Sequence, residues 1–290
     1  MKQNIALIGP GRVGTAVTRH LCRAGYPIRA IVSRDRQRAV DACRFVGCAD
    51  SAAATDYEDA GKAQIILLAV PDDQIRAVAG TFQSLCHGAG RTLIHFSGLH
   101  RAEIMRHPES TQALLSIHPL FPFANRRKAY DNIVGCPCAL EGDPGSIPLG
   151  RELISAFQGS GFLLASDQKA LYHTAASMAS NYLVTLVACA RDLFTTCGIP
   201  QDEALPLLMP LLRETLENIF AFSPEQGLTG PISRGDEATV KRHLEELKTS
   251  CPDIYPLYLE LGRKTLELAS RARRLTTEKQ RILTEIFADD

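Results

Sequence analysis

The sequence contains no tryptophan, carries no net charge and has no apolar run of the ~18 residues that a membrane-crossing helix needs. Lys+Arg and Asp+Glu both number 32, so the one-sided positive charge of a dedicated nucleic-acid binder is missing. No Lys/Arg-rich amphipathic segment indicates a membrane surface. The first apolar run begins at Ile5, so we expect no secretory signal peptide. These absences predict a cytoplasmic protein with no nucleic-acid or membrane partner.

The nine cysteines are an odd number and include no Cys-x-x-Cys pair. The nearest two are Cys136 and Cys138, and most of the others lie among apolar residues. Scattered thiols of this kind indicate a reduced compartment and give no set of metal ligands. We therefore expect free, buried thiols and no metal site.

The first 165 residues alternate short apolar runs with helical stretches. The run at 65–70 is wholly apolar and is followed by Pro71, which is typical of a strand buried on both faces of a parallel sheet. This alternation predicts an α/β domain with a doubly wound (Rossmann) parallel sheet. We expect strands at 5–8, 28–33, 65–70, 92–96 and 114–117, extended by 133–140 and 162–165, and helices at 14–24, 36–47 and 73–86.

No strand pattern follows residue 166, and the rest of the chain has the periodicity of helices. The first helix is expected to continue from 166 to 197. We therefore divide the chain into a dinucleotide-binding Rossmann domain, residues 1–165, and an all-helical domain, residues 166–290. Further helices are expected at 202–222, 236–248, 252–273 and 277–287.

A glycine-rich turn follows the first strand and opens the first helix. Gly9 permits the tight turn, Gly11 lets the backbone approach a pyrophosphate, and Gly14 lets helix and strand pack closely. The pyrophosphate would rest on the free N–H groups of the helix N-terminus. A glycine turn without a ligand is the alternative. The predicted cofactor-binding residues of this turn are Gly9, Pro10, Gly11, Arg12, Val13 and Gly14.

The end of the second strand indicates which dinucleotide is bound. NAD-binding domains usually place an acidic residue there to accept from the ribose 2′-hydroxyl, whereas this chain has Ser33 and Arg34. A hydroxyl and a guanidinium suit a 2′-phosphate, so we predict NADP(H). Asp35 leaves an alternative open, because a shift of one residue would make it the ribose partner. The arginines could also be a solvated helix start.

A narrow polar stripe runs along the long helix. Lys169, His173, Ser177 and Ser180 fall within an arc of ~80°, with Asn181 beside it, and the rest of the helix is mostly apolar. Buried polar groups without partners cost ~1–3 kcal/mol each, so the stripe indicates a groove or a ligand. A solvated face is the alternative. We predict that Lys169 and His173 are catalytic and that Ser177 and Asn181 bind substrate.

Three other residues are assigned from their position. His118 follows an apolar strand at the sheet edge where open α/β sheets bind ligands, which makes it a third catalytic candidate. His95 lies within its strand and is expected to be a core histidine bonded to the backbone. Arg234 precedes a helix cap at Asp236 and could bind a substrate carboxylate or phosphate, or could only hold its loop together.

The chain resembles the two-domain Rossmann-type NADP oxidoreductases whose helical C-terminal half is a domain of unknown function. More remotely it is similar to pyrroline-5-carboxylate reductase, ketopantoate reductase, the β-hydroxyacid dehydrogenases and prephenate dehydrogenase. The resemblance implies a nicotinamide cofactor and a homodimer formed through the helical domain. The motifs that carry it are Gly9–Gly14, Ala69–Asp73, His95–Gly98, Ile117–Leu120, Tyr172–Ala176, Ser180-Asn181 and Leu228–Asp236.

The resemblance also implies roles for single residues. Ala69, Val70 and Pro71 match the segment that passes the ribose and nicotinamide, and Ser97 lies where relatives hold the nicotinamide. Lys169 and His173 match a Lys-x-x-x-Asn helix, with histidine in place of asparagine. Thr229 matches a substrate-holding loop, and His118 matches a histidine that contacts the substrate hydroxyl.

Together these observations predict an NADP-dependent oxidoreductase that transfers a hydride between nicotinamide and a small carbonyl or imine compound. Such a reaction needs a proton donor within ~3 Å of the developing oxyanion or amine. The alternative is a non-catalytic NADP-binding dimer that senses cofactor and binds a partner. An enzyme of another reaction on a Rossmann scaffold is a third possibility.

Overall fold

The structure is a computed structural model that describes residues 2–86 and 90–288. The chain forms two compact units, Met1–Asn181 and Tyr182–Asp290. The first contains every strand of the described chain, and the second is helical. The predicted fold class is confirmed. The domain boundary at residue 165 stays a prediction.

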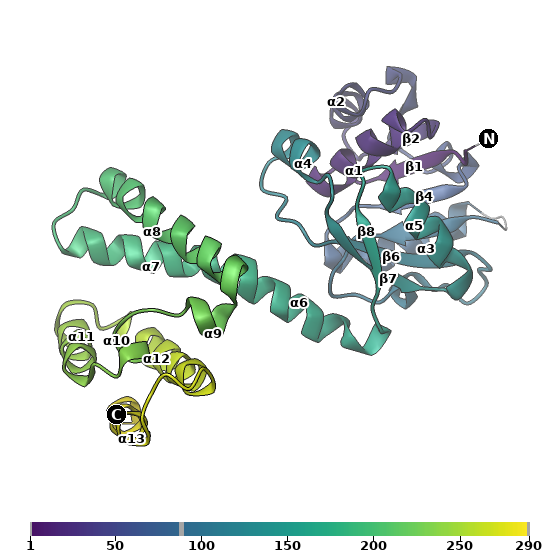
Figure 1. Ribbon diagram of the computed structural model, residues 1–290. Helices are drawn as coiled ribbons and strands as arrows, with labels where there is room; N and C mark the ends of the chain where they lie inside the picture. The colour runs from purple at the N-terminus through teal and green to yellow at the C-terminus, as the bar shows by residue number, and fades with distance from the viewer. Residues whose placement is uncertain (1, 87–89, 289–290) are drawn as a thin grey trace. The chain divides into compact units, whose positions relative to one another are not determined.

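The first unit is built on an eight-stranded sheet with the order β3-β2-β1-β4-β5-β6-β7-β8 (Figure 1). All neighbouring strands are parallel except β6 and β7. The strand order reverses direction at β1, between β2 and β4, which is where such sheets bind ligands. The strands are β1 (Ile5–Ile8), β2 (Ile28–Val32), β3 (Ala53–Ala54), β4 (Ile65–Leu68), β5 (Thr92–His95), β6 (Ala113–Pro119), β7 (Pro137–Gly142) and β8 (Ser160–Leu163).

Both faces of this sheet are covered. Along β1, Leu7 belongs to one apolar cluster, whereas Ala6 and Ile8 belong to another on the opposite face. The first cluster includes side chains of α1, α2 and α5, and the second includes side chains of α3. The helices of this unit are α1 (Arg12–Arg23), α2 (Arg36–Val46), α3 (Ile75–Leu85), α4 (Arg126–Asn132), α5 (Ile147–Ser155) and α6 (Lys169–Ser177).

Two helices of this unit, α4 and α5, were not expected from the sequence. The predicted strand at 133–140 was wrong in its first four residues, because β7 begins only at Pro137. Residues 133–136 instead connect α4, which ends at Asn132, to β7. Asn125 caps α4 by accepting from the N–H groups of Arg127 and Lys128. Basic residues occupy the first turn of α4, so it lacks the apolar periodicity by which a helix is identified.

The predicted helix from 166 to 197 is interrupted. A short 3₁₀ turn at Ser166–Gln168 leads into α6, a π-helical turn follows at Met178–Tyr182, and α7 covers Leu183–Thr196. A π turn has no proline or glycine marker here, which explains why the sequence did not predict it. Such turns are frequent at functional sites.

The second unit is made of helices around an apolar cluster that includes Val240, Leu259 and Leu283. Two short helices, α9 and α10, were not expected. The other boundaries agree with the predicted ones within three residues. The helices after α7 are α8 (Gln201–Phe222), α9 (Pro224–Gly227), α10 (Pro231–Arg234), α11 (Glu237–Ser250), α12 (Tyr255–Arg271) and α13 (Thr277–Ala288).

Candidate active site

The glycine turn after β1 has the geometry that a dinucleotide requires. Gly9 has a φ of 84°, and a Cβ there would lie 2.9 Å from the Ala69 carbonyl oxygen. A Cβ on Gly14 would lie 2.6 Å from the Cβ of Ala69 and 2.8 Å from Leu7 Cδ1. Gly11 is exposed, and a Cβ there would make only an ordinary contact with the Ala69 carbonyl oxygen at 3.7 Å, so its backbone can be approached from outside. The residues present therefore fit a pyrophosphate on the N-terminus of α1.

The residues after β2 include a carboxylate that is already engaged. Asp35 is the N-cap of α2, and its Oδ1 accepts from the N–H groups of Gln37 at 2.8 Å and Arg38 at 3.4 Å. Ser33 directly follows the strand and Arg34 is exposed. The carboxylate that could have favoured NAD thus stabilises a helix start. The hydroxyl of Ser33 and the guanidinium of Arg34 are the other polar groups directly after β2.

Other predicted cofactor residues lie on the same edge of the sheet. Arg12 is exposed and its Nη1 donates to the carbonyl of Phe123 at 3.4 Å. Ala69 and Val70 follow β4 and are half-buried, and Pro71 is exposed. Because β1 to β6 are parallel, these segments and the end of β5 share one edge.

Ser97, which follows β5, links two strand ends. Its Oγ donates to Asp72 Oδ2 at 2.6 Å, and it accepts from the N–H groups of Leu99 at 3.2 Å and His100 at 3.0 Å. The side chain is buried. Ser97 therefore holds the segment after β4 against the loop after β5.

Lys169 is an internal residue of this unit, only 1% exposed. Its Nζ donates to the carbonyl of Ser97 at 3.1 Å and to Ser116 Oγ at 2.7 Å. Burial lowers the pKa of Lys169 to about 8, and the carboxylates of Glu141 and Asp72 oppose that shift. Two N–H groups of the ammonium thus tie α6 to the end of β5 and to β6. The polar stripe is not a solvated face at Lys169.

The imidazole rings of His118 and His173 lie next to each other and next to Gly98. The centroids of the two imidazoles are 6.0 Å apart, and both rings are half-buried. A Cβ on Gly98 would lie 2.5 Å from His173 Cδ2 and 2.8 Å from His118 Nε2. Burial lowers the pKa of His118 to about 4, with further lowering by Lys169 and His173. The structure thus brings all three catalytic candidates to the ends of β5 and β6.

His95 is the core histidine that its place in the strand predicted. It is fully buried, its Nδ1 accepts from the N–H of Ser97 at 3.1 Å, and its Nε2 donates to the carbonyl of Arg101 at 3.2 Å. Burial lowers its pKa to about 3. His95 is therefore neutral and structural, as expected.

The remaining predicted substrate residues are divided between the two units. Ser177 is half-buried at the end of α6, and Asn181 is exposed in the π turn. In the second unit, Thr229 is exposed and Arg234 is an exposed residue whose carbonyl accepts from Lys279 Nζ at 2.8 Å. Asp236 caps α11, as the sequence indicated.

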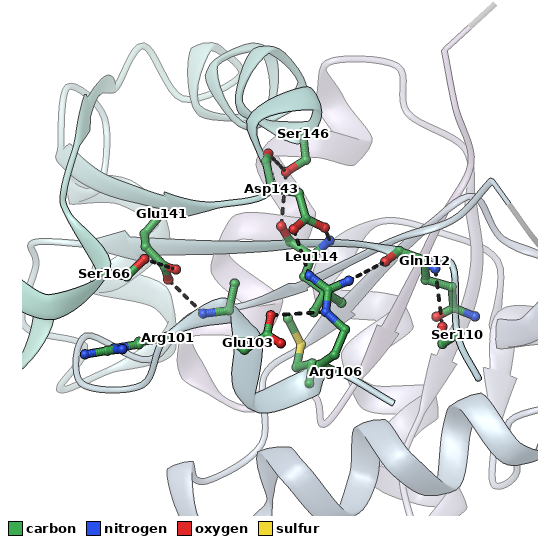
Figure 2. Close-up of polar contacts among 12 residues, drawn as sticks. Arg101, Glu103, Arg106, Ser110, Gln112, Leu114, Glu141, Asp143, Ser146 and Ser166 are labelled. Carbon is green, nitrogen blue, oxygen red and sulfur yellow. Dashed lines mark hydrogen bonds and ion pairs between the residues drawn. The ribbon is translucent and has the colours of Figure 1, made fainter. Parts of the chain in front are cut away.

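Sequence reasoning missed three residues that contact this site or support it. Tyr172 bonds His118, Ser116 bonds Lys169, and buried Glu141 accepts from Ser166 Oγ at 2.8 Å and from the N–H of Ala102 at 2.7 Å. Figure 2 shows the contact between Glu141 and Ser166. A carboxylate inside a run of buried strand residues was the available signal for Glu141.

The described residues contain neither a cluster of metal ligands nor a helix that could cross a membrane. Within the described residues, 2–86 and 90–288 taken together, no group of three or more His, Cys, Asp or Glu side chains could hold a metal ion. In the same residues no helix combines the length and the apolarity needed to cross a membrane.

Comparison with protein families identifies two domains. Residues 4–94 match the family described as NADP oxidoreductase coenzyme F420-dependent, and residues 136–265 match Domain of unknown function (DUF2520). The first part of the chain is thus similar to an NADP oxidoreductase family and most of the rest to DUF2520, which is the resemblance that the motifs indicated. A search of curated proteins found no match.

Solved structures resemble the whole chain. A protein from Thermotoga maritima is 26% identical, with a TM-score of 0.74 over 93% of this chain and 99% of that one. An NADP oxidoreductase from Bacteroides fragilis is 21% identical, with a TM-score of 0.70 over 91% and 98%. Pyrroline carboxylate reductase from Plasmodium falciparum, with NADP bound, is 11% identical, with a TM-score of 0.58 over 97% and 98%. The last two likenesses show a shared fold.

Proposed function

We propose that this NADP-dependent oxidoreductase transfers a hydride between the nicotinamide of NADP(H) and a small carbonyl or imine compound. The observation that carries the proposal is the meeting of Lys169, His118 and His173 at the ends of β5 and β6. The glycine turn after β1 lies on the same edge of the sheet. Cofactor and proton donors would thus share one edge, which is the arrangement that hydride transfer requires.

The chain's own residues would hold the cofactor along this edge. The turn Gly9–Gly14 would receive the pyrophosphate, Ser33 and Arg34 the 2′-phosphate, and the segments Ala69–Pro71 and Ser97 the nicotinamide half. When bound, NADP(H) supplies or accepts the hydride. Lys169, His173 and His118 are the candidates to move the accompanying proton.

In the first unit, the polar side chains proposed to bind substrate are Ser97, Ser177 and Asn181. In the second unit, taken by itself, the proposed substrate-binding residues are Thr229 and Arg234. The guanidinium of Arg234 is exposed and could take a carboxylate or phosphate in a bidentate manner. We propose that residues 1–165 form the dinucleotide-binding domain and that residues 166–290 form a domain for substrate binding and dimerisation.

A homodimer formed through the helical domain is part of the proposal. On α7 and α8, large apolar side chains lie uncovered by any other helix of their unit, including Val184, Leu211 and Phe220. Exposed apolar surface of this extent usually marks an interface, and a second copy of the chain is the partner we propose. Light scattering should give about twice 31.6 kDa. A constant mass near that of one chain would contradict the dimer.

The reaction is tested by incubating the protein with NADPH and a panel of α-keto, β-keto and cyclic imino acids. We expect the absorbance of reduced nicotinamide to fall with at least one compound. Tight NADPH binding without oxidation by any member of a broad panel would favour the non-catalytic alternative instead.

A further inference from the structure

Tyr172 is bonded to a histidine of the candidate site. Its hydroxyl lies 2.8 Å from His118 Nδ1, and the two rings are perpendicular, with an interplanar angle of 87°. Tyr172 precedes His173 on α6, whereas His118 lies on β6. The phenol of Tyr172 thus contacts Nδ1, whereas Nε2 is the ring nitrogen that lies near Gly98.

The direction of this hydrogen bond follows from the acidities of its two partners. Burial raises the pKa of Tyr172 to about 12 and lowers the pKa of His118 to about 4, so both groups are neutral at pH 7. An imidazole nitrogen is a better acceptor than a phenol oxygen, and a phenol is the better donor. Tyr172 therefore donates to Nδ1, and the ring proton of His118 resides on Nε2.

The Nε2 edge of His118 is the edge that Gly98 leaves uncovered. The space that a Cβ on Gly98 would take lies 2.8 Å from Nε2. In the described part of the chain Nε2 has no hydrogen-bond partner, yet it is not among the buried polar atoms that lack one. An N–H donor that solvent can reach therefore points into the candidate site.

We propose that Tyr172 supplies a proton to the reacting atom through His118, and that this atom is the oxygen of a neutral carbonyl rather than the nitrogen of an iminium ion. The inference rests on the proposed function. Hydride adds to the carbonyl carbon, and the electron pair of the C=O bond moves to oxygen. That oxygen takes the proton of Nε2, Nδ1 takes the proton of Tyr172, and water reprotonates the phenolate.

The net transfer from Tyr172 to the substrate oxygen runs toward the stronger base, because an alkoxide is more basic than a phenolate. The charged and titratable groups around His118 are Lys169 and His173 of α6 and Asp72 after β4. Asp72 already accepts from Ser97. The N–H of His118 Nε2 can donate to a carbonyl oxygen but opposes the N–H of an iminium, and the positive charge of the buried Lys169 ammonium adds to that repulsion. This is the reason for the choice of a carbonyl.

The chain contains a matched control for this pair. Tyr258 lies 2.8 Å from His243 Nδ1 with an interplanar angle of 86°, which reproduces the Tyr172–His118 contact outside the candidate site. Tyr172→Phe and Tyr258→Phe each remove one phenol oxygen. The two substitutions should differ only in which histidine changes its tautomer: His118 for Tyr172→Phe and His243 for Tyr258→Phe.

The tautomer is measured on the protein without substrate, by ¹⁵N–¹H spectra of histidine-labelled samples in which His118→Gln identifies the His118 signals. We expect the proton of His118 on Nε2 and no titration between pH 5.5 and 8. Tyr172→Phe should give a mixture of tautomers at His118, and Tyr258→Phe should leave them unchanged. A proton on Nδ1 in the parent protein, or tautomers that Tyr172→Phe does not alter, would overturn the relay.

The substrate class is measured with pairs of ketones and cyclic imines of similar carbon skeleton. We expect carbonyl reduction to dominate, and Tyr172→Phe to lower its kcat about 10²-fold with unchanged NADPH affinity, the usual weight of general acid catalysis. Reduction of imines alone would overturn the choice of a carbonyl while leaving the proposed oxidoreductase intact. Failure to oxidise NADPH with any compound would contradict both.

Discussion

The C-terminal ends of the sheet strands form two halves that differ in how their polar side chains are held. The exposed half follows β1 and β2, and the buried half lies at β5 and β6. After β1 and β2, Arg12 and Arg34 are exposed and belong to short local motifs. At β5 and β6, Ser97 and Lys169 are buried and bonded to one another. Exposed charges can receive a phosphate without rearrangement, whereas buried groups fix geometry and change acidity. The first half is therefore suited to binding and the second to chemistry.

The largest effect is expected where the buried half is altered. Lys169→Met and His173→Ala should each lower turnover about 10²-fold or more, because each removes a candidate proton-handling group. NADPH affinity should not change. His20→Ala, in the last turn of α1, is the control and should keep full activity. Unchanged turnover in both site variants would contradict a chemical role for these two side chains.

Lys169 should also make stability depend on pH. Its pKa is about 8 in the folded chain, below the 10.5 of an ordinary exposed lysine, so the unfolded chain binds more protons between these two values. Stability should therefore rise with pH through that window, by about 2–3 kcal/mol from pH 7 to 10 at ~1.4 kcal/mol per pKa unit. Denaturant unfolding of the parent and Lys169→Met measures the difference. Parallel pH profiles would contradict a lowered pKa.

In the exposed half the expected effect is on cofactor choice. Arg34→Ala should weaken NADPH binding roughly ten- to a hundredfold, since a charge-assisted bond contributes ~1.5–3 kcal/mol, and should leave NADH binding unchanged. Titration can follow cofactor fluorescence, because the chain has no tryptophan. Arg44→Ala, at the far end of α2, is the control. Equal affinities for the two cofactors in the parent protein would refute the assignment.

The smallest effect concerns Asp35. Asp35→Ala should lower the free energy of unfolding by ~1 kcal/mol, the usual cost of losing an N-cap, with little change in either cofactor affinity. Thermal melting and cofactor titration measure the two quantities. A variant of normal stability that loses NADH affinity would instead make Asp35 a ribose partner.

The fold could be predicted where local sequence decides it. The wholly apolar run at 65–70 and the turn Gly9–Gly14 gave the parallel sheet and its binding edge, because both depend on neighbours in the chain. The helix α4 and the π turn at Met178–Tyr182 could not be found in this way. Their residues show no apolar period and no breaker by which either element could be identified.

The site was predictable only in part, for a similar reason. The helical spacing of Lys169 and His173 placed both on one stripe, and His118 was found from its strand. The partners of Lys169 lie 72 and 53 residues away in the chain, at Ser97 and Ser116. Single-sequence periodicity carries no information on such pairings, so the burial of the lysine could not be anticipated.

The burial of Lys169 has a consequence for its chemical reactivity. Amines are acylated in the uncharged form, and a pKa of about 8 gives Lys169 a larger uncharged fraction at neutral pH than an ordinary lysine has. The side chain is only 1% exposed, so a reagent cannot reach it while α6 is bonded to β5 and β6. Acylation of Lys169 therefore records each opening of that contact, and its rate measures how often α6 separates from β5 and β6.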